Sequence, residues 1–425
     1  MGDRVSKVGT LTIQLRLGKK TEEGVMSTER ECIIITGSSG LLGHALSHHF
    51  GEQDHTVLGF DREGPPYPPP NTETIFCDLT SDESVQKTMF LVESRYGARI
   101  KAVFHLAAYY SFDGENSHMY KDLTLKGTER MLRELENFDV KQFIFSSSML
   151  AYKPNDKGRR LTEDSELGGT WAYPQSKVDT EKLLQEKHGK IPLVVLRIAG
   201  VYSNICQSIP LAHQIQRIYE RSIEGHMYSG DIHVKQSFVH LEDVVDAFDA
   251  CVRNADKLPP YSVFNISETN TMSYQEIQTE VANELFDEPW KTIEVPKPFA
   301  KAGAWVEQQL PLPEKPFIRP WMIDRASDNY EMDSTRAERV LGWRAKHSLR
   351  ETLPLMLEGL KVDPKKWYEL NKLKPVPQNP HNEEVAGRDG GSQNLDLNRA
   401  SRNHSERETQ PQNTDAHSNK KNRVA

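Results

Sequence analysis

The chain of 425 residues is predicted to adopt an α/β fold with a doubly wound parallel sheet, on the basis of two observations. Short, wholly apolar runs alternate with longer amphipathic stretches up to about residue 200, and a glycine cluster directly follows the first apolar run. Unbroken apolar runs are typical of strands buried on both faces of a parallel sheet. Strands that alternate with helices form right-handed βαβ units, whose strands lie side by side in one sheet.

The apolar runs indicate the positions of the strands, and the amphipathic stretches indicate the positions of the helices. Strands are expected at 32–35, 56–60, 74–76, 102–106, 142–145 and 193–198, and helices at 41–50, 82–96, 119–137 and 171–188. After Gly200 the spacing becomes uneven, with helices expected at 208–221, 241–254 and 274–285 and a strand at 263–266. This change predicts a smaller, mixed lobe over much of 200–360.

Composition excludes several classes of function. The formal net charge is −8 and the part expected to fold has no Lys/Arg cluster, which argues against nucleic acid as a partner. No signal-peptide pattern and no apolar stretch long enough for a bilayer is present, so we expect a cytoplasmic protein without an integral membrane segment. The four cysteines form no CxxC pair, which argues against a disulfide framework or a structural zinc site: Cys32, Cys77, Cys206 and Cys251. A small-molecule substrate is the expected partner.

The two ends of the chain differ from the rest. Residues 1–25 are expected to be a disordered extension, with Met26 as an alternative start. Residues 375–425 contain no aromatic side chain and only scattered apolar ones. Such a segment buries too little apolar surface to offset its chain entropy, so we expect a disordered polar tail.

The glycine cluster, TGSSGLLG at 36–43, predicts a dinucleotide site. It lies between the first strand and the first helix, where glycines allow a tight turn and close approach of a pyrophosphate to the helix N-terminus. Asp61 ends the second strand, and a carboxylate there binds the ribose hydroxyls and repels a 2′-phosphate, which favours NAD over NADP. The expected contacts are Gly37, Ser39, Gly40, Leu41, Leu42, Gly43, Asp61 and Arg62 in this Rossmann-type domain.

Asp78 and Leu79 follow the third strand and allow two interpretations. They could contact the adenine of the dinucleotide. Alternatively, Asp78 could be the N-cap of the helix that begins after Thr80.

Tyr173 and Lys177 are spaced at i and i+4 on an expected helix, which places both side chains on one face. An ammonium beside a phenol favours the phenolate, so we expect the pKa of Tyr173 to be lowered and Tyr173 to exchange a proton with a substrate oxygen. Ser146, Ser147 and Ser148 end the strand upstream, at the sheet edge where ligands bind in open α/β sheets. Ser148 is the serine we favour from its position in the run.

These motifs, in this order, resemble the extended short-chain dehydrogenase/reductases. The resemblance covers TGSSGLLG, Asp61, the HLAA segment at 105–108, the FSSS strand end and YPQSK, and it continues through the FVHLEDV and LGW segments to about residue 360. It implies that Tyr173 is the general acid/base, that Lys177 binds the nicotinamide ribose, and that Ser148 polarises the substrate oxygen. It also adds Leu106, Ala107, Ala108, Tyr173 and Lys177 to the expected cofactor contacts.

The sequence departs from the family pattern at three places. Met149 and Leu150 occupy the positions of the Asp-Glu pair that sugar-nucleotide 4,6-dehydratases use, so dehydratase chemistry is not expected. Gln236, beside Lys235, replaces the arginine with which nucleotide-sugar epimerases bind a diphosphate, and Thr124 replaces a usual asparagine. Aromatic residues in the lobe make an apolar, sterol-like or phenylpropanoid-like substrate plausible, or are simply lobe core: Phe299, Trp305, Phe317 and Trp321.

The sequence as a whole predicts an NAD-dependent oxidoreductase or epimerase that transfers hydride at a secondary alcohol or its ketone. The alternatives are a nucleotide-sugar epimerase with tightly bound NAD, and a non-catalytic NAD-binding sensor or assembly subunit. We expect an NAD-binding domain at 26–200, a mainly substrate-binding lobe with returning Rossmann elements at 201–374, a homodimer as a possible assembly, and no metal. His44, His48 and His49 include an i, i+4 pair, but no further ligand completes a metal site there.

Overall fold

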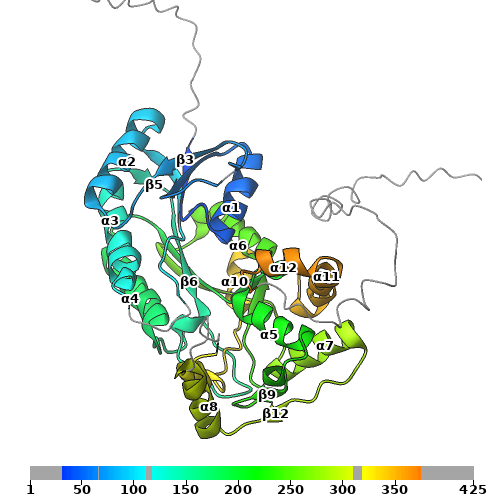
Figure 1. The fold of residues 1–425 in the computed structure, drawn as a ribbon. Coiled ribbons are helices and arrows are strands. Elements are labelled where there is room, and N and C mark those ends of the chain that lie inside the picture. The colour runs from blue at the N-terminus through cyan, green and yellow to red at the C-terminus, as the bar shows by residue number, and fades with distance from the viewer. Residues whose placement is uncertain (1–30, 66, 112–116, 310–317, 375–425) are drawn as a thin grey trace, which may run out of the picture. The chain divides into compact units, whose positions relative to one another are not determined.

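A single parallel sheet forms the centre of the computed structural model, which describes residues 31–65, 67–111, 117–309 and 318–374 (Figure 1). Its strands lie in the order β3-β2-β1-β4-β6-β7-β11, with β5 paired to β4, and every pair is parallel. The predicted Rossmann-type, doubly wound α/β fold is therefore confirmed. The strands are β1 (Cys32–Thr36), β2 (Thr56–Asp61), β3 (Thr72–Phe76), β4 (Arg99–His105), β5 (Asp139–Val140), β6 (Phe143–Ser148), β7 (Leu193–Ile198) and β11 (Tyr261–Ile266).

Helices cover both faces of the sheet because successive strand residues point to opposite sides. In β1, Ile33 and Ile35 belong to one apolar core, and Cys32 and Ile34 to the other. One face is covered by α1 (Leu41–Glu52), α6 (Leu241–Arg253) and α10 (Thr335–Leu341). The other is covered by α2 (Asp82–Tyr96), α3 (Lys126–Leu135) and α4 (Ala172–Lys187).

The lobe is built on two small parallel sheets, β8–β10 and β9–β12, together with the remaining helices. Its elements are β8 (Gly200–Tyr202), α5 (Ile209–Tyr219), η3 (Ile223–His226), β9 (Met227–Tyr228), β10 (Phe238–His240), α7 (Tyr274–Phe286), β12 (Ile293–Glu294), α8 (Lys297–Gln309), α9 (Pro320–Arg325), α11 (Leu349–Val362) and α12 (Pro364–Leu370). Three short helical turns complete the chain: η1 (Tyr120–Leu125), η2 (Met149–Ala151) and η4 (Ala255–Lys257).

One expectation about the elements needs correction. The helix expected at 119–137 is a π-helical turn, η1, followed by α3. Within 201–374, β11 pairs with β7 and extends the central sheet, and α6 packs on that sheet. Most of the apolar residues of α11 are buried, whereas Leu355 and Val362 are exposed, and α12 buries Trp367 and Tyr368. The extension at 1–25, the tail at 375–425 and Phe317 lie outside the described residues, and the domain boundary near 200 stays a prediction.

An ion pair beneath the carboxyl ends of the strands joins the sheet to α4. Arg197 in β7 and Glu181 in α4 are 4% and 3% exposed, and Arg197 Nη2 lies 2.7 Å from Glu181 Oε2. The Ser147 hydroxyl donates to Glu181 from β6, and Arg197 Nη1 donates to the Tyr152 hydroxyl at 2.9 Å. Tyr152 donates in turn to Asn265 Oδ1 in β11 at 2.6 Å. The network therefore connects β6, β7, β11 and α4.

We expect Arg197→Met to lower the free energy of unfolding by about 3–5 kcal/mol, because it leaves the Glu181 carboxylate buried without its cation. Arg350→Met is the matched control, since Arg350 is half exposed in its pair with Glu276 and should change stability by less than about 1 kcal/mol. Urea unfolding measures both. The double variant Arg197→Met/Glu181→Met should recover part of the lost free energy of unfolding. An Arg197→Met variant as stable as the wild type would contradict the role of the Arg197–Glu181 pair in stability.

Candidate active site

The glycine loop between β1 and α1 has the geometry of a dinucleotide cradle. Gly37 has a φ of +72°, in the left-handed region that favours glycine. A Cβ on Gly43 would lie 2.2 Å from the Gly37 carbonyl oxygen, so loop and helix pack too closely for a side chain. Helix α1 begins after Gly40 without a side-chain cap, which leaves its first amide groups available to an anion. The loop therefore fits a pyrophosphate.

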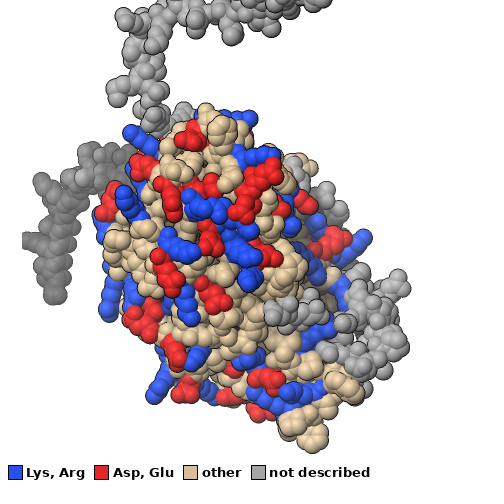
Figure 2. Space-filling view, turned by 90° about the vertical axis from the view of Figure 1, so that its left-hand side faces the viewer, with Lys and Arg blue, Asp and Glu red and all other residues tan. Residues whose placement is uncertain are grey.

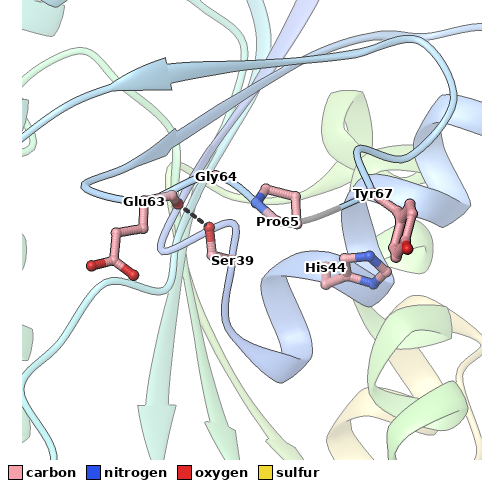
Figure 3. Close-up of a pocket in the computed structure, with 6 residues that line it drawn as sticks. All are labelled: Ser39, His44, Glu63, Gly64, Pro65 and Tyr67. Atoms are coloured by element: carbon pink, nitrogen blue, oxygen red, sulfur yellow. Dashed lines mark hydrogen bonds between the residues drawn. The ribbon is translucent and has the colours of Figure 1, made fainter.

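Asp61 lies beside this loop at the end of β2. Its carboxylate accepts hydrogen bonds from the backbone amides of Ser39 at 3.0 Å and Arg62 at 2.7 Å. A pocket of about 340 Å³ lies between the start of α1 and the segment that follows β2. It is lined by Ser39, His44, Glu63, Gly64, Pro65 and Tyr67 (Figure 3). The Ser39 hydroxyl donates to the Glu63 carbonyl oxygen and closes one side of it.

Asp78 and Leu79 follow the end of β3, and Asp78 does not cap the helix that comes next. The N-cap of α2 is Ser81, whose hydroxyl accepts from the Ser84 amide, so the N-cap interpretation of Asp78 is wrong. Asp78 Oδ1 instead accepts from the amide and hydroxyl of Thr80, at 2.9 and 2.7 Å. Leu79 is 4% exposed and belongs to the core. The adenine contact of these residues stays a prediction.

The HLAA segment fixes the end of β4 against the glycine loop. The amides of Leu106 and Ala107 donate to Thr36 Oγ1 at 3.1 and 3.2 Å. Ala108 follows them beyond the end of the strand. His105 lies between Thr36 and Thr128, at 3.0 and 2.8 Å, and burial lowers its pKa to about 3. His105 is therefore a neutral link in the core rather than an acid or base.

Tyr173, Lys177 and Ser148 come together where α4 begins and β6 ends. The Ser148 hydroxyl lies near enough to the Tyr173 phenol to lower its pKa. Lys177 is 3% exposed, its Nζ donates to the Ser146 carbonyl at 2.7 Å, and it lies 5.9 Å from the centre of the Tyr173 ring. The Ser147 hydroxyl is used by Glu181. Ser148 is thus the serine that meets Tyr173.

Burial shifts the pKa values of this group. Desolvation raises the pKa of Tyr173 to about 12, against a smaller lowering effect of the Ser148 hydrogen bond. The expected lowering of the Tyr173 pKa is wrong for this geometry, because the effect of burial outweighs the lowering by Ser148, and Lys177 is not among the groups that shift this pKa. Desolvation also lowers the pKa of Lys177 to about 8, although Glu181 acts in the opposite direction. Lys177 therefore loses its proton, and with it its positive charge, at moderately alkaline pH.

A cavity of about 610 Å³ opens from Ser148 and Tyr173 into the lobe. Leu42, from the glycine loop, lines it as well, so the cofactor loop and the cavity share a wall. Most of the other lining side chains are apolar, among them Ile198, Val201, Ile209, Pro210, Leu211, Val234, Phe238, Met272, Ile277, Met322 and Ile323.

Aromatic rings that the sequence motifs did not point to surround the catalytic group. The Tyr110 ring packs edge-on against Tyr173 with centroids 4.7 Å apart. Trp171 lies 5.6 Å from Tyr173 and 4.9 Å from Trp321, and all of these residues line the cavity. Tyr110 lies two residues after the HLAA segment, and Trp171 lies two residues before Tyr173 of the YPQSK motif. Their closeness to these motifs in the chain is the one signal in the sequence that could have indicated them.

The structure shows which of the residues that depart from the family pattern line the cavity and which do not. Met149 and Gln236 line the cavity, whereas Lys235 lies 3.5 Å from Glu331 and is not part of the lining. Thr124 Oγ1 accepts from the Tyr109 amide at 2.9 Å. Phe299 and Trp305 are 73% and 59% exposed, so they are neither cavity wall nor lobe core. Leu150 and Trp321 also line the cavity.

The described residues give little support to other ligands. His48 and His49 face Glu52 and Asp249 rather than a shared ion site. His240, Glu242 and His347 lie close together, but the ring nitrogens of His240 face Asn204 Oδ1 and the Glu242 amide. Basic and acidic residues are interspersed over the face shown in Figure 2, without a basic patch. None of the helices in the described ranges is long and apolar enough to span a bilayer.

Comparison of the sequence with known families decides the assignment. The profile of the NAD dependent epimerase/dehydratase family matches residues 33–267, more than half of the chain. The chain belongs to this family. The predicted extended short-chain dehydrogenase/reductase membership, the enzyme class and the NAD cofactor are confirmed at this level.

Individual relatives in this family are distant and differ in activity. UDP-glucose 4-epimerase of Lactobacillus helveticus is 25% identical over 62% of this chain and 77% of its own length. A 3-beta-hydroxysteroid dehydrogenase of Mycolicibacterium neoaurum is 23% identical over 51% of this chain and 59% of its own. The Thermotoga maritima UDP-glucose 4-epimerase structure with UDP-glucose has a TM-score of 0.58 at 22% identity, covering 78% of this chain and 99% of that one. This last similarity establishes the fold alone.

Asp61 should make this family member prefer NAD to NADP by about tenfold or more, because its carboxylate repels a 2′-phosphate. Asp61→Asn should reduce the preference, whereas Glu52→Gln, an exposed change on α1, should not. Titration of cofactor fluorescence measures both affinities. Equal or tighter binding of NADP by the wild type would remove Asp61 from this role and point to Arg62 as a phosphate ligand.

Lys177 should give folding stability a pH dependence. The pKa of Lys177 falls from 10.5 in the unfolded chain to about 8 in the folded protein, so between these pH values the unfolded chain binds one proton more. The free energy of unfolding therefore rises with pH across this range, and the gain is lost as the pH falls through about 8. Relative to the wild type, Lys177→Met should therefore lose about 1 kcal/mol of stability between pH 7 and pH 9. Urea unfolding at both pH values tests this. Lys187→Met, half exposed on the same helix, should show no such trend.

Proposed function

We propose that this protein is an NAD-dependent oxidoreductase that interconverts a secondary alcohol and its ketone on a bulky, largely apolar molecule of sterol-like size. The observation that carries the proposal is the cavity of about 610 Å³ that begins at Ser148 and Tyr173 and is lined mostly by apolar side chains. Cavities of this size bury most of a drug-sized ligand. The replacement of a cation by Gln236, with Lys235 paired to Glu331, supports an uncharged substrate body.

NAD would be held by the glycine loop, by Asp61 at the adenosine ribose, and by Tyr173 and Lys177 at the nicotinamide end. When bound, the cofactor would supply hydride transfer: the oxidised form would take a hydride from the alcohol carbon, and the reduced form would return one to the ketone carbon. The remaining cofactor contacts, from Leu106 to Ala108, would lie along the same strand ends.

The protein's own chemistry is proton transfer at the substrate oxygen. The Tyr173 hydroxyl would exchange the proton, and Ser148, which lines the same cavity, would orient the same oxygen. Burial keeps the Tyr173 phenol protonated at neutral pH, which suits donation of its proton to a developing alkoxide in the reducing direction. In the oxidising direction, the Lys177 ammonium would stabilise the phenolate that forms.

A nucleotide-sugar epimerase is the second candidate, and two cavity-lining cations favour it. Arg217 and Arg325 both contribute to the lining, and a diphosphate needs such partners. The charge of Arg325 is partly balanced, since Arg325 donates to the Thr170 carbonyl at 2.9 Å and lies 3.7 Å from Asp328. A sensor without catalysis has no need for Ser148, Tyr173 and Lys177 together. A cytoplasmic location and a homodimer stay predictions.

A substrate screen separates these candidates. Purified protein with NAD is offered sterols, aromatic alcohols and nucleotide sugars, and reduced cofactor is followed by absorbance. Turnover of a sterol-like alcohol supports the proposal. Conversion of a nucleotide sugar without net reduction, detected by product analysis, favours the epimerase instead.

Tyr173→Phe should lower turnover by roughly 10²-fold to 10⁴-fold while leaving NAD affinity intact, because it removes only the hydroxyl that exchanges the proton. Ser148→Ala should slow turnover without affecting NAD, and Lys177→Met should damage both. Tyr96→Phe, on α2, is the matched control and should behave like the wild type. Melting temperatures establish that each variant folds. Near-normal turnover by folded Tyr173→Phe would end the assignment of Tyr173 as the acid/base.

A further inference from the structure

The turn between β8 and α5 holds two neighbouring residues in a backbone conformation that side chains disfavour. Cys206 has a φ of +76° and Gln207 a φ of +54°, both in the left-handed region, and neither is a glycine. The backbones of Ser203 and Cys206 are joined by two hydrogen bonds, of 2.8 and 2.9 Å. A conformation of this kind persists where the surrounding contacts hold it in place.

This turn sets the position of one wall of the large cavity. Gln207, at the end of the turn, lines the cavity, and so do Leu211, Gln214 and Arg217 of α5. Helix α5 begins at Ile209, only two residues after Gln207. A change in the turn would therefore move the start of the helix, and with it the side chains that α5 contributes to the wall.

The contacts that hold the turn come from the far end of the described chain. Asn371, the residue that follows α12, is 3% exposed. Its Oδ1 accepts from the Gln207 amide at 2.7 Å, and its Nδ2 donates to the Ile205 carbonyl at 3.0 Å. The same Nδ2 donates to the Trp367 carbonyl at 2.9 Å, which ties Asn371 to α12. One side chain thus binds the backbone on both sides of Cys206.

Helix α12 also binds the opposite end of α5. The Tyr368 hydroxyl donates to Glu220 Oε1 at 2.8 Å, and Glu220 is the residue that ends α5. The cavity-wall helix is therefore held at both of its ends from one short segment, which lies beside α11 in Figure 1. The family profile ends at residue 267, so this segment lies outside the residues that the profile matches.

We infer that Asn371 is a positioning residue for the substrate, because it holds the turn at 205–207 and, through the turn, the cavity wall formed by α5. The inference rests on the proposed function, since the wall belongs to the proposed substrate cavity. Asn371 is not one of the described residues that line the cavity, and it acts through Gln207. Its loss should weaken substrate binding and leave the chemistry at Tyr173 and the binding of NAD unchanged.

The Cys206 thiol reports on the turn without any substrate. It is buried, and burial raises its pKa to about 12, so it should react only slowly with iodoacetamide in the wild type. Asn371→Ala should raise its labelling rate by about tenfold or more, because two hydrogen bonds to the turn are lost. Mass spectrometry of the tryptic peptides measures the rate. Cys32, buried in β1, reports on unfolding of the sheet and should keep its wild-type rate.

Two variants are matched controls for this labelling. Tyr368→Phe removes the bond at the far end of α5 but keeps Asn371, and Asn254→Ala removes an amide that also donates to two backbone carbonyls, at the end of α6. Both should leave the labelling of Cys206 within about twofold of the wild type. An equal rise in Tyr368→Phe would overturn the inference, because general loosening of α12 would then expose the turn.

Steady-state kinetics on the alcohol found by the substrate screen test the effect on the cavity. Asn371→Ala should raise KM by about tenfold, with kcat and NAD affinity within about twofold of the wild type. Fast labelling of Cys206 with an unchanged KM would overturn the inference, since the turn would then move without consequence for the substrate. Failure of the screen would count against the proposed reaction, whereas wild-type labelling of Cys206 in folded Asn371→Ala would overturn this inference alone.

Hydrogen exchange of the wild type decides the matter if Asn371→Ala does not fold. The Gln207 amide donates to Asn371, so it should exchange about tenfold or more slowly relative to an unfolded peptide. An unprotected Gln207 amide would overturn the inference.

Discussion

The buried pair of Arg197 and Glu181 is the constraint on which the arrangement of the site depends. Helix α4 carries Tyr173 and Lys177, and Glu181 follows Lys177 one turn later on that helix. Because Glu181 is held by Arg197 from β7 and by Ser147 from β6, the helix has one position relative to the strand that ends in Ser148. The same carboxylate also opposes the lowering of the Lys177 pKa. A single ion pair thus couples the register of α4 with the electrostatics of the site.

Local signals allowed the sequence to predict much of this molecule. The run Cys32–Thr36, the glycines after it and Asp61 lie close together in the chain, and their spacing alone indicates a strand, a turn and a helix. The approach of Tyr173 to Ser148 needed the family resemblance, since periodicity does not reveal which strand faces which helix. The structure places Ser148 and Tyr173 in the wall of one cavity, which gives the resemblance a physical basis.

The remaining features arise from contacts between distant segments. Nothing near Tyr261–Ile266 indicates that this strand pairs with β7 rather than within the lobe. Tyr152 and Asn265, which complete the buried network, are far apart in the chain and become neighbours only in the fold. The direction of the Tyr173 pKa depends on how completely the site is desolvated, and tertiary packing determines that. The N-cap interpretation of Asp78 is wrong because Ser81, a competing cap, lies three residues further on.

The close packing of Gly43 against Gly37 has a consequence for the evolution and redesign of cofactor use. With no room for a side chain between loop and helix, the pyrophosphate end of the site tolerates almost no variation. The segment after β2 is different, because Arg62, Glu63 and Gly64 are exposed and end in a surface pocket. Selection can therefore alter the adenosine end freely while the loop stays fixed. Substitutions that change the cofactor preference of this enzyme family are therefore expected among the few residues that follow Asp61.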